Sequence, residues 1–139
     1  MTPTLILDCS VAMAWCFADE STPEAAEVQD RMASEAAVVP GHWFLEVANV
    51  LAMAEKRGRI SFDDSRQFVE LLSFFEIQTD DEVFRRAFEH LLPLCRSHHL
   101  TSYDAAYLDV ALRRRLPLAS LDDALRQAAT SLGLQVLGK

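Results

Sequence analysis

The chain has 139 residues, a length typical of one domain, so we expect residues 1–139 to form a single domain. Half of the residues are hydrophobic and 24% are charged, which excludes a disordered or collagen-like chain. Asp and Glu number 21 against 13 Lys and Arg, and the net charge of −8 argues against nucleic-acid binding through a broad basic face. An enzyme that reaches phosphates through metal ions stays open, because it needs the carboxylates that are in surplus here.

The predicted elements alternate between strands and helices. Thr22-Pro23 and the box Ser61-x-x-Asp64 are typical helix starts, and Thr79-x-x-Glu82 resembles a second box. In chain order we expect a strand at 4–8, helices at 10–17 and 23–34, a strand at 37–39, helices at 43–56 and from 61, a strand at 74–78, a helix at 79–91 with further turns to 98, a helix at 102–114, a strand at 116–120, a helix at 122–132 and a strand at 134–137. The strands are short and continuously apolar, so helices should cover both of their faces in a layered α/β fold.

The cysteines and the N-terminus favour a cytoplasmic protein. Cys9, Cys16 and Cys95 form no CxxC pair, which is typical of reduced thiols. The N-terminus has no basic region, and the apolar run Leu5-Ile6-Leu7 stops at Asp8. We therefore expect neither a signal peptide nor a membrane-spanning segment.

Four acids fall where predicted strands end or predicted helices begin. Asp8 ends the first strand, Asp122 follows the strand at 116–120, and Glu46 and Asp104 lie in first helical turns. In an open parallel sheet these positions share one edge, where ligands bind. Four carboxylates gathered there would repel one another unless a cation lay among them, and Mg²⁺ or Mn²⁺ prefers such oxygen ligands.

Each acid also has a purely structural explanation. Asp8 and Asp122 could cap the helices that follow them, and Thr101-x-x-Asp104 matches a capping box. Asp123 could serve only the dipole of the last long helix. Glu46 could belong to a polar stripe on the surface, although its apolar neighbours make an unpaired acid costly there.

Basic residues carry weaker signals. We interpret Arg113-Arg114-Arg115 as favourable to the helix dipole and solvated, ahead of a contact with RNA phosphates. Arg85-Arg86 is interpreted as a solvated face, and His42 as a turn residue near Glu46. The adjacent pair His98-His99 lacks the further ligands that a zinc site needs.

Four short motifs, in this order, resemble those of PIN-domain nucleases. They are Asp8-Cys9-Ser10 for D-x-S, Glu46-x-x-Asn49 for E-x-x-N, Ser102-x-Asp104-Ala105-Ala106-Tyr107 for (S/T)-x-D-A-x-Y, and Leu118-Ala119-Ser120-Leu121-Asp122 for L-(A/V)-T-x-D with Ser in place of the commoner Thr. The motifs span most of the chain, and its size resembles that of the VapC toxins of bacterial toxin–antitoxin pairs.

The resemblance implies a three-layer α/β/α sandwich around a parallel sheet of four to five strands. It also implies an endoribonuclease that depends on Mg²⁺ or Mn²⁺ and hydrolyses RNA with a metal-activated water. By position, the catalytic acids would be Asp8, Glu46, Asp104 and Asp122. The metal ligands would be Asp8, Asp104 and Asp122, the supporting polar residues Ser10, Asn49 and Ser120, and a further acid Asp123.

The resemblance also implies partners. These are an RNA substrate, a VapB-type antitoxin lying across the active-site groove, and a second copy in a homodimer, with no membrane involved. Trp15, Phe17, Trp43 and Phe44 are expected in the core, and any of them at the surface would mark a subunit or antitoxin groove.

Three alternative functions stay open at this point. One is a housekeeping PIN nuclease in RNA processing, and another is a non-catalytic α/β domain that binds a partner and uses its acids only as caps. A phosphotransfer domain is the third, although no D-x-D follows Leu7 and Lys is absent between Lys56 and Lys139.

Overall fold

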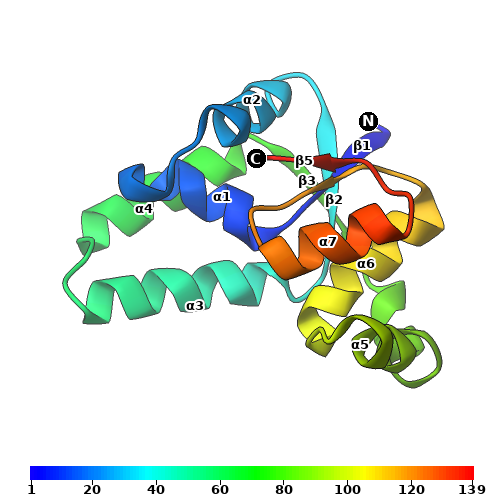
Figure 1. The fold of residues 1–139 in the computed structure, drawn as a ribbon. Coiled ribbons are helices and arrows are strands. Elements are labelled where there is room, and N and C mark those ends of the chain that lie inside the picture. The colour runs from blue at the N-terminus through cyan, green and yellow to red at the C-terminus, as the bar shows by residue number, and fades with distance from the viewer.

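A five-stranded parallel sheet forms the centre of the molecule (Figure 1), and the computed structural model describes every residue from Met1 to Lys139. The strands are β1 (Pro3–Leu7), β2 (Ala36–Pro40), β3 (Glu76–Asp80), β4 (Leu118–Ala119) and β5 (Val136–Leu137). They lie in the order β3-β2-β1-β4-β5, and all neighbours are parallel. Leu5, Ile6 and Leu7 are wholly buried, as expected for a central strand covered on both faces.

Helices flank this sheet and complete the predicted α/β/α sandwich (Figure 1). They are α1 (Cys9–Cys16), α2 (Pro23–Arg31), α3 (Trp43–Lys56), α4 (Phe62–Ser73), α5 (Leu92–His98), α6 (Ser102–Arg114) and α7 (Asp123–Ser131), with 3₁₀ turns at Ala18–Glu20 and Glu82–Arg86 and a π-helical turn at Ala87–Leu91. Helix α6 packs against β1, β2 and β4, and α1 packs against α2 and α3. The predicted fold class is therefore confirmed.

The strand order creates a switch point between β1 and β4. From β1 the chain winds outward through β2 to β3, and from β4 it winds outward to β5 on the other side. The connections leave these two neighbouring strands in opposite directions, and ligands of open α/β sheets commonly bind beyond the carboxyl ends at such a point. Asp8 directly follows β1, and Ser120 directly follows β4.

Local capping signals set most of the helix boundaries. The Thr22 hydroxyl accepts the Ala25 amide at 3.0 Å, with Pro23 opening α2. Ser61 and Asp64 form both hydrogen bonds of the predicted capping box at the start of α4. Most other boundaries lie within one to three residues of their predicted positions.

The segment from 74 to 91 differs from its prediction. Strand β3 lies two residues later than expected, because its register with β2 runs from Ala36↔Glu76 to Pro40↔Asp80. This pairing places Thr79 inside the strand, so the capping box predicted there is wrong. The predicted helix becomes a 3₁₀ turn followed by a π-helical turn, and α5 begins one residue before Pro93, which cannot donate a helical hydrogen bond.

A buried ion-pair network overturns the interpretation of several arginines. Arg113 bridges Asp80 and Asp109, with Nη2–Oδ1 and Nε–Oδ2 distances of 2.9 Å. Arg114 also pairs with Asp80, and Arg86 pairs with Asp109, each at 2.9 Å. The sequence interpretation as solvated or dipole-stabilising side chains is therefore wrong for Arg86 and Arg113, because two buried carboxylates require them. Arg114 is exposed in the last turn of α6, as that interpretation predicts, and pairs with Asp80 as well.

The core prediction is wrong for one aromatic side chain. Trp43 and Phe17 are buried and Trp15 is half-buried, but Phe44 is 47% exposed. Phe44 and Trp43 are neighbours on α3, so they point to different sides of the helix, and only Trp43 faces the sheet core.

Candidate active site

Asp8 lies at the centre of a hydrogen-bonded network that joins the ends of β1 and β4. Its Oδ2 accepts the hydroxyls of Ser10 at 2.7 Å and Ser120 at 2.8 Å. The Ser10 hydroxyl in turn accepts the Leu121 amide at 2.9 Å. Asp8 occupies the cap position of α1 without making a capping hydrogen bond. Its side chain is therefore oriented by the two serines and not by the helix that it precedes.

Glu46 is held in the first turn of α3 by a residue from α6. The Tyr107 hydroxyl donates to Oε1 of Glu46, and the Tyr107 ring is wholly buried. Nε2 of His42 lies 3.4 Å from the same oxygen and 3.1 Å from the backbone oxygen of Tyr103. Two side chains that the sequence did not identify as site residues therefore surround this carboxylate.

Asp104 and Asp122 each begin a helix beside these groups. The Asp104 amide donates to the Thr101 hydroxyl at 3.2 Å, but the return bond of a capping box, from the Thr101 amide to the Asp104 carboxylate, is missing. Asp122 caps α7, because its Oδ1 accepts the Leu125 amide at 2.8 Å. Its own amide donates to Ser120 at 3.1 Å, which connects it to the Asp8 network.

The pKa shifts of these acids show that they influence one another. Burial raises the pKa of Asp8, although both serine hydrogen bonds oppose the shift. Burial, with the charges of Asp8 and Asp104, raises the pKa of Glu46 to about 7 against the hydrogen bond from Tyr107. Burial, together with the charges of Asp8 and Asp122, raises the pKa of Asp104 to about 6. The fold therefore brings the four predicted acids into one negative field.

No lysine or arginine is paired with any of these four acids. Asp80 provides the contrast: burial would raise its pKa, but Arg113 and Arg114 hold that pKa below its usual value. The protein thus supplies arginines to Asp80 and Asp109 and leaves the four predicted acids without such a partner. Carboxylates without a basic partner stay available to a divalent ion.

The remaining predicted site residues lie apart from this network. Asn49 is exposed on α3 and makes no hydrogen bond to the acids. Asp123 is exposed and pairs with Nζ of Lys139 at 2.6 Å, which lowers the pKa of this carboxyl. This exposed ion pair is the one interaction that the structure gives the Asp123 carboxylate.

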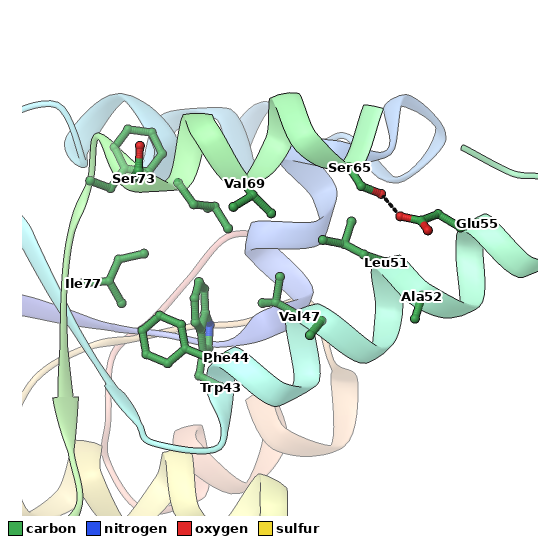
Figure 2. A pocket seen from close by; sticks show the side chains of 13 residues that line it. Trp43, Phe44, Val47, Leu51, Ala52, Glu55, Ser65, Val69, Ser73 and Ile77 are labelled. Carbon is green, nitrogen blue, oxygen red and sulfur yellow. Dashed lines mark hydrogen bonds between the residues drawn. The ribbon is translucent and has the colours of Figure 1, made fainter. Parts of the chain in front are cut away.

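The largest cavity is an apolar groove of about 690 Å³ between α3 and α4 (Figure 2). Phe44, Val47 and Leu51 contribute from α3, and Val69 and Leu72 from α4. Glu55 and Ser65 form a hydrogen bond across one end of it (Figure 2). Phe44 and Val47 flank Glu46 in sequence, so the groove begins on the helical turn that carries this acid.

The parallel sheet, with its strand order reversing between β1 and β4, defines an α/β protein of the doubly wound type, in which ligands commonly bind at the carboxyl edge of the sheet. Residues 5–130 match the family model of the PIN domain, and the chain belongs to this family. No helix combines the length and the apolar character that crossing a membrane requires.

Two solved structures share the fold at low sequence identity. PAE2754 from Pyrobaculum aerophilum is 21% identical with a TM-score of 0.70, over 96% of this chain and 83% of that one. FitAcB from Neisseria gonorrhoeae is 16% identical with a TM-score of 0.64, over 95% of both chains. No curated protein sequence matches the chain significantly.

Sequence reasoning missed Tyr107 and His42 as parts of the site. Tyr107 stands in the motif that carries Asp104, so its motif position was an available signal. For His42 the only signal in the sequence was its position four residues before Glu46, because this spacing places two side chains on one face of a helix.

Proposed function

We propose that the protein is an endoribonuclease that depends on Mg²⁺ or Mn²⁺ and acts as the toxin of a toxin–antitoxin pair. One observation carries the proposal: four carboxylates from separate elements share one negative field and have no lysine or arginine partner. PIN domains are a nuclease family, and membership supports hydrolysis of a phosphodiester as the reaction.

The residues present fit a hard divalent cation. Asp8, Asp104 and Asp122 offer carboxylate oxygens, which Mg²⁺ and Mn²⁺ prefer, and no cysteine or histidine pair competes for the position. No three acidic, histidine or cysteine side chains come close enough to enclose an ion by themselves. Mg²⁺ commonly keeps several waters and takes substrate phosphates as ligands, so this open arrangement suits it.

Each side chain then has a defined task. Asp8, fixed by Ser10 and Ser120, with Asp104 and Asp122, would hold the ion. Glu46, held by Tyr107, would help to position the ion or the attacking water. A bound divalent ion supplies two effects, a lower pKa for that water and neutralisation of phosphate charge. Attack at phosphorus breaks the bond to the 3′ oxygen and leaves a 3′-hydroxyl and a 5′-phosphate.

The protonation states favour exchange of protons for a metal ion. Burial and neighbouring acids raise the pKa of Glu46 to about 7 and that of Asp104 to about 6. Near neutral pH these groups share protons while no cation is present, and they lose them when positive charge arrives. Metal binding should therefore strengthen as the pH rises from 5 to 8.

An antitoxin is the partner that we propose for the α3–α4 groove (Figure 2). The groove is lined mainly by apolar side chains, as is a groove that accepts an amphipathic helix. Phe44, at one end of the groove, lies beside Glu46 on α3. An antitoxin segment that leaves the groove at this end would pass the acids, and an arginine on it would be attracted to them. We place this regulated activity in the cytoplasm, in accord with three free cysteines.

A homodimer is the assembly that we propose for a second apolar surface. Phe84, Phe88 and Leu92 are exposed on the segment that joins β3 to α6, and Tyr103 is exposed in the first turn of α6. Exposed apolar side chains in this number mark an interaction surface. Phe88→Glu should give a monomer by sedimentation equilibrium where the wild-type protein gives a dimer.

Mapping of cleavage sites on total cellular RNA tests the proposed activity. The wild-type protein and Asp104→Asn would be compared in Mn²⁺ and in chelator, with Asp123→Asn as the matched control. We expect cuts only when Mn²⁺ and Asp104 are both present, and we expect Asp123→Asn to cut like the wild-type protein.

The same experiment separates the alternative functions. A folded wild-type protein that neither cuts RNA nor binds Mn²⁺ would leave a partner-binding domain with capping acids. Cuts confined to one precursor RNA, without growth arrest on expression, would favour a housekeeping nuclease in RNA processing.

A further inference from the structure

His42 connects the two helices that carry Glu46 and Asp104. It precedes α3, and its ring reaches the first turn of α6, where Nε2 lies 3.1 Å from the backbone oxygen of Tyr103. Tyr103 is the direct neighbour of Asp104. Glu46 lies four residues after His42, with 3.4 Å between Nε2 and Oε1.

The bond to Tyr103 defines the tautomer of the ring. A carbonyl oxygen can only accept a hydrogen bond, so the Nε2 atom of His42 must carry the proton. The same N–H faces the Glu46 carboxylate, which is also an acceptor. One donor therefore points at one atom from each of the two acid-bearing helices.

Packing holds the ring in this place. His42 lies edge-on to Tyr107, with centroids 5.4 Å apart, and it is tilted against Tyr103 at 5.8 Å. Only 12% of the His42 side chain is exposed. It occupies the cap position of α3 but makes no capping hydrogen bond, so helix capping does not explain a polar residue there.

We propose that His42 is a positioning residue that fixes the distance between Glu46 and Asp104 through its bond from Nε2 to the Tyr103 carbonyl. The inference rests on the proposed nuclease function. The two helices start far apart in sequence, and among side-chain hydrogen bonds only those of His42 and Tyr107 join them near the acids. Without the bond from His42, the Tyr107 hydroxyl alone would join α3 to α6 near the acids, and the separation of the two helices would be less firmly fixed.

Two substitutions at this position test the geometry. In His42→Gln the amide nitrogen takes the place of Nε2 and can still donate to Tyr103. In His42→Asn the amide nitrogen takes the place of Nδ1 and falls short. We expect His42→Asn to lower kcat and Mn²⁺ affinity roughly 10-fold or more, as loss of supporting hydrogen bonds does in metal sites.

His42→Gln should restore most of both quantities, and thermal unfolding should show both variants folded. Mn²⁺ affinity would be measured by calorimetry without RNA, and cleavage by initial rates on a defined RNA. A merely structural role would not separate these two amides. Long-range ¹H–¹⁵N spectra of the wild-type ring should show the proton on Nε2.

Three results would overturn the inference. They are equal behaviour of the two variants, wild-type affinity and kcat in His42→Asn, or a ring protonated on Nδ1 alone. Failure of the proposed function is distinct from these: a wild-type protein that does not cut RNA overturns the nuclease, while the ring spectra and Mn²⁺ titrations still decide the role of His42.

Discussion

At the scale of single residues, the surroundings of an aspartate or glutamate decide what it can do. Asp8 and Asp80 are both buried at the end of a strand, yet Asp80 meets arginines and Asp8 meets two serine hydroxyls. Hydroxyls orient a carboxylate without neutralising it. Asp8 thus stays able to attract a cation, whereas Asp80 is already paired.

Tyr107→Phe should move the acidic limb of the pH–rate profile to higher pH. The Tyr107 hydroxyl donates to Glu46 and opposes the effect of burial, which raises the pKa of this carboxyl to about 7. Without the hydroxyl that pKa rises further, so the carboxylate forms only at higher pH. We expect a loss of roughly 10-fold in cleavage rate at pH 7.

Initial rates between pH 5.5 and 9 would measure this shift. Tyr103→Phe is the matched control, because its exposed hydroxyl makes no hydrogen bond. Unfolding in urea would measure the linked effect on stability. Because the pKa of Glu46 is higher in the folded protein, the free energy of unfolding should fall as the pH rises from about 4.5 to about 7. Superimposable profiles for Tyr107→Phe and the wild-type protein would contradict the role of the hydroxyl.

At the scale of elements, the end of α6 is tied to the turn after β3 by charge. Arg113 and Arg114 come from α6, Asp80 ends β3, and Arg86 reaches Asp109 from the 3₁₀ turn. These ion pairs hold α6 against a segment whose backbone is irregular, because a 3₁₀ turn is followed there by a π-helical turn. Packing of α6 on the sheet therefore depends on ion pairs as well as on its apolar face.

Arg113→Met should lower the free energy of unfolding by about 3 kcal/mol, because it removes one cation from two buried carboxylates. Arg114 and Arg86 keep partial pairing, so the protein should still fold. Urea unfolding at pH 7 would measure the change, with the exposed Arg115→Met as control. A stable Arg113→Met that binds RNA weakly would instead indicate a contact with phosphates.

At the scale of the whole molecule, the chemistry and the proposed regulation share α3. The first turn of this helix carries Glu46, whose pKa the charge of Asp8 helps to raise, and α3 forms one wall of the apolar groove (Figure 2). A partner seated in the groove would thus lie next to the acids. Binding there provides a direct physical route to inhibition.

Val69→Glu should abolish binding of the antitoxin and leave RNA cleavage unchanged. Val69 is 53% exposed and lines the groove from α4, so the Val69→Glu variant should still fold. Its new carboxylate would face the apolar side of the antitoxin helix, which is unfavourable. Co-purification with a co-expressed VapB-type antitoxin would measure binding, with the wild-type chain as the positive control. Phe62→Glu is the control, because Phe62 is exposed on α4 outside the groove.

Tight co-purification of Val69→Glu with that protein would show that the antitoxin docks elsewhere. Loss of binding in Phe62→Glu as well would indicate a general effect of added negative charge on this surface. Loss confined to Val69→Glu would assign the groove to the partner.

Short-range signals along the chain were sufficient for most of the fold. Thr22 and Ser61 start helices because a side-chain oxygen meets an amide three residues later, and both lie within one turn. The apolar run at β1 demands burial wherever it lies. Acids at strand ends then follow from the alternation of elements, so the approximate location of Asp8 and Asp122 was predictable without a structure.

Only the tertiary structure decided which distant groups meet. The register of β3 with β2, the arginines around Asp80, the bond of His42 to Tyr103 and that of Tyr107 to Glu46 all join residues more than 20 positions apart. Local propensity does not encode such pairs, because their energies depend on burial and separation in three dimensions. In the folded chain arginines lie beside Asp80 but not beside Asp8, and the sequence pattern does not distinguish these two acids.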